Sequence, residues 1–162
     1  VDVLLMDTGA GISENVLRFA SYADEVVVVT TSNLAATVDA YSIIKILREM
    51  DPKSKIGLVT NLAKSMYHAK NVFNRLDTAT RKYLGYALGD LGYVLEDEHV
   101  ETANQSRRPL LLSFPQAPAS RCLHQVADTI LNTRVFKNRA KQSCFHDIVG
   151  ALKRTMVGAT AV

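Results

Sequence analysis

The sequence has no tryptophan and only two cysteines, Cys122 and Cys144, which stand apart from each other and from any CxxC pair or histidine cluster. This excludes the usual zinc-ligand patterns and a disulfide framework, and it is typical of reduced thiols in the cytosol. No apolar run approaches the roughly 18 residues that a membrane-spanning helix needs, and no signal-peptide pattern opens the sequence. We therefore expect a cytoplasmic protein, attached at most to the surface of a membrane.

Strong charge is also lacking. The formal net charge is +3, without the concentrated Lys/Arg stripe of a dedicated nucleic-acid binder, so no specific nucleic acid is expected as a partner. What is present is the composition of a folded domain: 162 residues, 48% of them hydrophobic and 22% charged. This length and composition predict one globular domain with a sizeable core and exclude a disordered chain.

Short runs rich in β-branched residues alternate with longer runs that carry apolar residues at helical spacing. The short runs predict strands at 3–6, 25–30, 56–60 and 92–95. The longer runs predict helices at 14–23, 34–50, 64–84, 117–134 and 143–157, of which the second ends at Asp51-Pro52. Because the strands are apolar on both faces, the order predicts an α/β fold with a mostly parallel sheet flanked by helices.

The opening residues "VDVLLMDTGAG" place Asp7 at the end of the first predicted strand, before a turn of small residues. In α/β folds ligands bind outside the carboxyl ends of strands, and a carboxylate there is suited to hold Mg²⁺ beside a phosphate. The alternative is that Asp7 only caps the turn. A receiver domain would also end a strand in "LLMD", but the acidic pair and the lysine that it needs are not in usable positions.

Several longer segments carry a family resemblance. Residues 1–47, "LVTN" at 58–61, and "LGYVLEDEHVETANQSRRPLLLSFPQAPASR" at 91–121 resemble, in order and spacing, the MinD/ParA family of deviant Walker A ATPases. The resemblance is strongest to the FlhG branch, also called FleN or YlxH, which controls flagellar number and placement. It implies a P-loop NTPase-like fold of the SIMIBI class.

The resemblance assigns roles residue by residue. Asp7 matches the Walker B aspartate, which supports Mg²⁺ through water, and Thr8, Gly9, Ala10 and Gly11 match switch II. Asn61 matches the asparagine that reads adenine, since its carboxamide offers both a donor and an acceptor. The alternative is that it caps the next helix. Leu95 and Asp97 lie in the segment that matches the adenine loop, although relatives commonly have proline where this chain has Leu95.

The phosphate-binding motifs GxxxxGK[ST] and KGGxGK do not occur in this sequence. In the family they precede the Walker B strand, so we expect this chain to be the C-terminal part of a longer one, without its central first strand and P-loop. Residues 1–134 are then part of a MinD-like nucleotide-binding domain, and 135–162 are a tail. The chain alone is predicted to be inactive in ATP hydrolysis.

The tail sequence "SCFHDIVGALKRTMVG" predicts an amphipathic helix, with Phe145, Ile148, Val149, Leu152 and Met156 on one narrow stripe. This helix either packs on the core of the protein or lies in the interface of an anionic membrane, as the family's C-terminal targeting helix does. Arg107 and Arg108 are likewise either surface charges or a contact to a partner protein or phosphate.

The function implied by the resemblance is an ATP- and Mg²⁺-dependent switch that regulates flagellar number or placement. The resemblance implies a homodimer in the ATP-bound state. It also implies partners among flagellar assembly GTPases, switch-complex proteins or transcription regulators. The location is cytoplasmic, with reversible association with the inner face of the cell membrane as an open alternative. A second reading is a non-catalytic, truncated paralogue that acts as a protein- or membrane-binding module.

Overall fold

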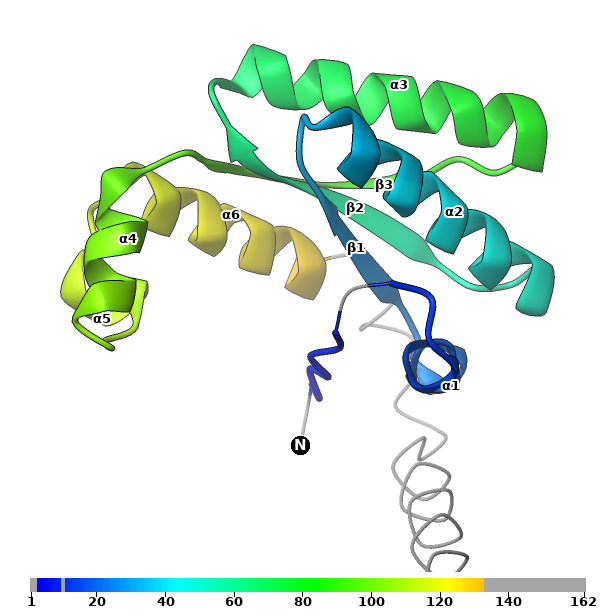
Figure 1. The fold of residues 1–162 in the computed structure, drawn as a ribbon, viewed down its shortest axis with the longest axis horizontal. Helices are drawn as coiled ribbons and strands as arrows, with labels where there is room; N and C mark the ends of the chain where they lie inside the picture. Colours follow the sequence, from blue (N-terminus) through cyan, green and yellow to red (C-terminus); the bar gives the residue numbers. More distant parts are fainter. Residues whose placement is uncertain (1–2, 10, 133–162) are drawn as a thin grey trace, which may run out of the picture.

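A computed structural model describes residues 3–9 and 11–132, and of Asn15 only the backbone. Its elements follow one another as α1 (Glu14–Tyr22), β1 (Val26–Thr30), α2 (Leu34–Met50), β2 (Ile56–Ala63), α3 (Met66–Leu84), β3 (Gly89–Leu95), α4 (Glu98–Gln105), α5 (Leu110–Ser113) and α6 (Pro118–Asn132). Figure 1 shows the strands as a small sheet with helices on both sides. The predicted α/β fold is thus confirmed.

The described strands form one parallel sheet in the order β1-β2-β3. β1 pairs with β2 in unbroken register over its whole length. The register between β2 and β3 shifts twice. Near their start Leu58 pairs with Asp90 but Val59 pairs with Gly92, which leaves Leu91 as an extra residue, and the second shift lies between Thr60 and Ala63. Gly92 has a φ of 112°, a conformation that favours glycine. Since the strands are parallel, their carboxyl ends share one edge of the sheet.

Two apolar clusters cover the two faces of the sheet. One lies under α2 and α3, the helices that connect consecutive strands, and its buried members are Val28, Ala40, Ile44, Leu47, Ile56, Leu58, Leu76 and Leu88. The other lies between the sheet and α6, with Val59, Leu91, Val94, Ala119, Cys122 and Val126. Figure 1 shows α2 and α3 above the sheet and α6 below it. The alternation of strand residues between two apolar faces explains why the strands are apolar throughout.

The helix ends have local causes. Asn33 caps α2 by accepting a hydrogen bond from the backbone N–H of Ala35 at 2.8 Å, and the helix ends before Asp51-Pro52 as predicted. Ser65 caps α3, which therefore starts two residues later than predicted. At the other end of α3, Gly85 takes the left-handed conformation with a φ of 61°, which is common after the last helical residue.

The predicted strand at 3–6 is wrong for this structure. Residues 3–9 belong to no helix or strand, and Leu4 and Leu5 are 55% and 83% exposed. An apolar, β-branched run becomes a strand only when a neighbouring strand accepts its hydrogen bonds, and none of the described strands pairs with it. The apolar pattern favours a strand, but the pairing that completes a strand is a tertiary property.

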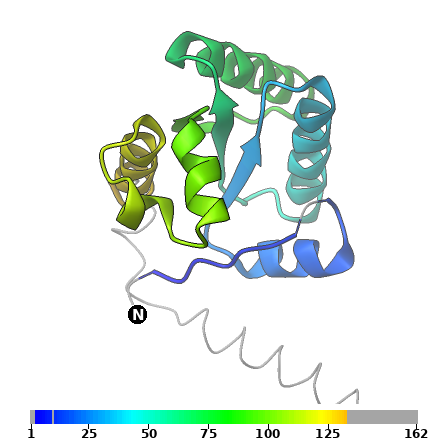
Figure 2. The same ribbon diagram turned by 60° about the vertical axis from the view of Figure 1, so that its left-hand side comes forward.

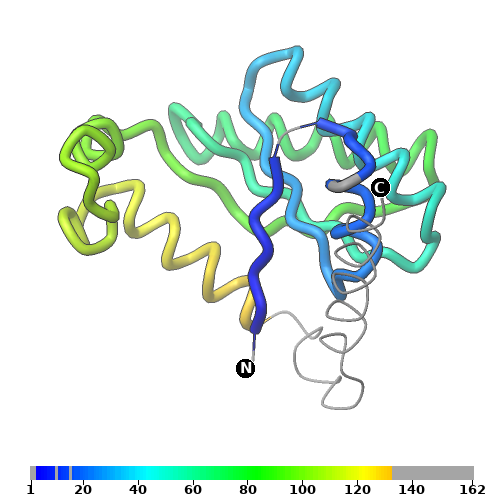
Figure 3. The backbone as a smooth tube through the Cα atoms, turned by 60° about the horizontal axis from the view of Figure 1, so that its bottom comes forward, coloured from blue at the N-terminus to red at the C-terminus, as the bar shows by residue number. Residues whose placement is uncertain are grey.

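No element is predicted between residues 96 and 116, yet the structure has α4 and α5 there. α4 has Asp97 as its N-cap and Glu98 and Glu101 in its first turn, a pattern that favours a helix start. After α5 the chain turns back into α6, as the tube in Figure 3 shows. β3 also starts three residues earlier than predicted, at Gly89.

Candidate functional site

The carboxyl ends of β2 and β3 bring two of the predicted site segments together. Ala63 of β2 is the register partner of Leu95 of β3, and the backbone N–H of Glu96 donates to the carbonyl oxygen of Ala63 at 3.0 Å. Asn61 lies two residues before Ala63 on the same strand. The segment of Asn61 and the segment of Leu95 therefore end side by side on the edge of the sheet where α/β folds bind ligands.

Asn61 is half-buried in a locally unusual backbone. Its side-chain Oδ1 accepts a hydrogen bond from the N–H of Leu62 at 2.9 Å, and Leu62 has a φ of 52°, which is uncommon for a residue with a branched side chain. The alternative role as a helix cap is wrong, because the cap of α3 is Ser65, whose Oγ accepts from the N–H of His68 at 3.1 Å. The Nδ2 group of Asn61 has no hydrogen bond to any described residue, so its donors are available to a ligand.

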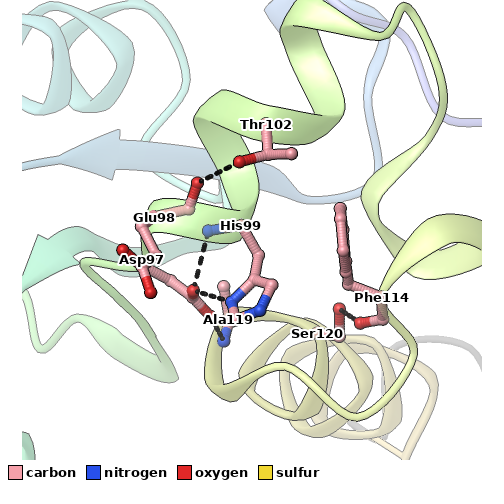
Figure 4. Close-up of polar contacts among 7 residues, drawn as sticks. All are labelled: Asp97, Glu98, His99, Thr102, Phe114, Ala119 and Ser120. Atoms are coloured by element: carbon pink, nitrogen blue, oxygen red, sulfur yellow. Dashed lines mark hydrogen bonds and ion pairs between the residues drawn. The ribbon is translucent and has the colours of Figure 1, made fainter.

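Asp97 lies two residues after Leu95, and its carboxylate accepts hydrogen bonds from other residues of the protein. Its side chain is only 4% exposed. Oδ1 accepts a hydrogen bond from the N–H of His99 at 3.0 Å, and this bond caps α4. Oδ2 accepts a hydrogen bond at 2.9 Å from the N–H of Ala119, which lies in the first turn of α6. The first N–H groups of a helix have no partner within the helix, so one carboxylate here satisfies two helix starts. Figure 4 shows these contacts.

The surroundings of Asp97 stabilise its charged form. The hydrogen bond from Ala119 is the main cause of a pKa below the ordinary value, and contacts with His99 lower the pKa further, while burial opposes them. Nδ1 of His99 lies 2.7 Å from Oδ1 of Asp97. Because a carboxylate can only accept, Nδ1 carries the hydrogen in this contact.

The ring of His99 in turn packs on Phe114, with 4.8 Å between the ring centroids, and Ser120 Oγ donates to the carbonyl oxygen of Phe114 at 2.6 Å (Figure 4). These contacts tie the loop after β3 to the start of α6. The sequence pattern names Asp97 but misses His99 and Ala119. The only local signal is the Asp-Glu-His order of a helix N-cap, because the partner in α6 lies 22 residues away.

The segment that carries Asp7 is not part of this arrangement. Asp7, Thr8 and Gly9 are exposed, and Gly11 has a φ of 94°, which agrees with a turn that needs glycine. Figures 1 and 2 both show residues 3–9, in dark blue, below the sheet. No hydrogen bond or strand pairing among the described residues joins Asp7 to Asn61 or Leu95.

The remaining predicted site residues either lie outside the described residues or are exposed. Ala10 and the tail helix with Phe145, Ile148, Val149, Leu152 and Met156 lie outside the described residues, as does the predicted domain boundary at 134/135. Arg107 and Arg108 are exposed after α4, and Arg107 has a φ of 52°. Exposure agrees with either of their two predicted roles. Among the described residues, no helix is long and apolar enough to cross a membrane.

Comparison with known proteins supports the family resemblance. The antiactivator FleN of Pseudomonas aeruginosa is 33% identical over 130 residues, which cover 80% of this chain and 46% of FleN. The flagellum site-determining protein YlxH of Helicobacter pylori is 27% identical over 133 residues, covering 82% of this chain and 45% of YlxH. These similarities support a MinD/ParA-family, FlhG-like protein over most of the chain. The chain spans about half the length of the curated relatives that it matches.

Two further proteins are similar to the chain at lower identity. An uncharacterized ATP-binding protein of Methanocaldococcus jannaschii is 26% identical over 134 residues, covering 83% of this chain and 48% of that protein. The crystal structure of the cell division ATPase MinD of Pyrococcus furiosus superposes with a TM-score of 0.50 and 16% identity, over 67% of this chain and 42% of MinD. At that identity the superposition shows the fold alone, a P-loop NTPase-like α/β fold. No family model matches the chain.

Proposed function

We propose that the protein to which this chain belongs is a MinD-like, ATP-dependent switch that regulates the number or placement of flagella. The observation that carries the proposal is the sequence similarity to YlxH, a flagellum site-determining protein, together with the higher identity to the antiactivator FleN. Nucleotide binding is supported by a relative named as ATP-binding and by the MinD ATPase fold. The proposed nucleotide is ATP.

The proposed base site is the edge formed by Asn61 and by the loop from Leu95 to Asp97. Its support is that the two segments end side by side on adjacent strands and that Asn61 keeps free Nδ2 donors. Adenine presents ring nitrogens that accept hydrogen bonds and an amino group that donates one, so a carboxamide and backbone groups can read it. Leu95 is half-buried and supplies an apolar surface beside the base.

Mg²⁺ is proposed for the complete protein on the family resemblance of Asp7 alone. The described residues contain no group of three His, Cys, Asp or Glu side chains that could hold a metal ion. Mg²⁺ is often bound by only one or two carboxylates together with nucleotide phosphates, so Asp7 has suitable chemistry. Asp7 alone does not make a magnesium site, and we derive no step through the ion.

Dimerisation in the ATP-bound state, partners in flagellar assembly or transcription, and association of the tail helix with anionic lipid are further proposals that rest on the family resemblance. The alternative function is a non-catalytic module without nucleotide turnover. A phosphate-binding loop encoded upstream of Val1 in the same reading frame would favour the switch over this module, whereas a start codon at that point would favour the module.

The experiment that tests the switch uses the complete natural protein. Asn61→Ala should weaken ATP binding by about two- to tenfold, the value of one hydrogen bond to a ligand, and should reduce the preference for ATP over GTP. The matched control is Asn71→Ala, an exposed asparagine on α3. Asp7→Asn should strongly lower kcat for ATP hydrolysis, whereas Asp39→Asn, at an exposed position of α2, should not.

Each result has a clear meaning. An unchanged ATP preference in Asn61→Ala would exclude this residue from the base site, and a normal kcat in Asp7→Asn would exclude its catalytic role. A complete protein that binds neither ATP nor GTP at millimolar concentration would refute the switch and leave the non-catalytic module.

A further inference from the structure

Asp97 is the buried polar group at the proposed base site that the nucleotide itself cannot easily reach. Its side chain is 4% exposed, and both carboxylate oxygens already accept hydrogen bonds from the protein. Oδ1 serves the N–H and the ring Nδ1 of His99, and Oδ2 serves the N–H of Ala119. A base that lies on the surface of the loop would have to displace one of these internal donors to contact the carboxylate.

The loop before Asp97 is held at two points. At its start, the N–H of Glu96 donates to the carbonyl oxygen of Ala63 on β2, at 3.0 Å. At its end, Asp97 is bonded to Ala119, which is fully buried in the first turn of α6. The backbone of residues 95–97 is therefore fixed between the sheet and α6, and its position depends on both attachments.

The second attachment is reinforced by the neighbours of Asp97. His99 is bonded to Asp97 and packs on Phe114, and the carbonyl oxygen of Phe114 accepts from Ser120, the residue after Ala119. Figure 4 shows that these side chains come from α4, from the turn after α5 and from α6. We call the Asp97–Ala119 hydrogen bond with this packing the α6 clasp.

We propose that Asp97 is a positioning residue for the nucleotide base, which acts through the α6 clasp by fixing residues 95–97 beside β2 and does not itself contact the base. This inference rests on the proposed function, because it assigns a role at the proposed base site. A loop held in the binding geometry loses less conformational freedom when the base binds, so the clasp raises affinity and base selectivity together.

The test uses two variants of the complete protein that break the clasp from opposite sides. Asp97→Asn keeps a good N-cap for α4 but replaces one acceptor oxygen by a donor, so it cannot serve both helices. Ala119→Pro removes the donor N–H and leaves Asp97 intact, at a first-turn position where proline is tolerated. The control is Asp90→Asn, at the other end of β3, where the carboxylate pairs with Lys70. Affinities are measured for ATP, GTP and inorganic tripolyphosphate.

We expect both clasp variants to lower the ratio of ATP to GTP affinity by about two- to tenfold, without a change in tripolyphosphate affinity. Asp90→Asn should leave all three affinities unchanged. A loss of selectivity in Asp97→Asn with full selectivity in a folded Ala119→Pro would mean that Asp97 contacts the base directly, and would overturn the inference. Full selectivity in both variants would overturn it as well.

A measurement on the unmodified protein covers the case in which Ala119→Pro fails to fold. The amide hydrogen of Ala119 should stay protected from exchange when ATP is bound, because the clasp persists in the complex. Loss of that protection on binding ATP would show that the carboxylate turns toward the base. If the unmodified protein prefers ATP but the clasp variants keep the full ATP-to-GTP affinity ratio, only this inference fails. If it binds no nucleotide, the proposed function fails with it.

Discussion

Replacement of Gly57 by alanine should destabilise the domain, because the space for a side chain at this position is already filled. A Cβ atom placed on Gly57 of β2 would overlap Cδ1 of Leu91 on β3 and lie 2.6 Å from Cγ of the same residue. Leu91 is 2% exposed and belongs to the core cluster between the sheet and α6, so its side chain has little room to move away. It is also the extra residue at the first register shift between β2 and β3.

The expected magnitude follows from two opposing effects. Overpacking a filled core costs about 1–3 kcal/mol, and the smaller conformational freedom of alanine in the unfolded chain offsets about 0.4–1 kcal/mol of this. The net loss should therefore be about 1–2 kcal/mol in the free energy of unfolding. For a domain of this size, that lowers Tm by roughly 2–8 °C.

The assay is urea unfolding followed by circular dichroism, with a double-mutant cycle. Leu91→Ala alone should cost about 2–5 kcal/mol through the cavity that it leaves. In the Leu91→Ala background, Gly57→Ala should cost almost nothing, because the clashing atoms are gone. The matched control is Gly9→Ala, where a Cβ would have no atom within 4 Å. Equal cost of Gly57→Ala in both backgrounds, or no cost in either, would refute the reasoning.

Three other predictions concern charge and the tail. Burial raises the pKa of Glu25 against an opposing effect of Lys55, and its Oε2 has no hydrogen-bond partner among the described residues. The charged form of Glu25 therefore lowers stability above the ordinary pKa of 4.5, so Glu25→Gln should raise Tm at pH 7 but not at pH 4. The control, Glu49→Gln, should not raise Tm at pH 7. The pKa of Asp97 is lowered, chiefly by the hydrogen bond from Ala119. The stability that the Asp97 carboxylate contributes is therefore present above pH 3.8 and is lost as the pH falls through the native pKa. The Tm difference between the native protein and Asp97→Asn should shrink in the same pH range. Finally, the complete protein should cosediment with anionic liposomes more strongly with ATP than with ADP, and Ile148→Glu should abolish this without a change in Tm; retained binding, or a collapse of the fold, would exclude the tail helix as the anchor.

Local chemistry was enough for much of the fold. α2 was predicted with its observed bounds, because its apolar residues recur at helical spacing and Asp51-Pro52 marks its end. The α/β class followed from strands that are apolar on both faces, and Asn61 and Leu95 were placed at strand ends that the structure does bring together. These features depend on residues close in sequence or on the general geometry of parallel sheets, so the sequence by itself determined them.

The tertiary structure alone decided the rest. The run at 3–6 has the composition of a strand, but a strand exists only where a neighbour completes its hydrogen bonds, and no described strand does so here. The clash expected at Gly57 comes from a leucine 34 residues away, and Asp97 finds its partner Ala119 across 22 residues. Such contacts depend on how helices and strands pack in space, and a single sequence without that packing cannot reveal which distant groups meet.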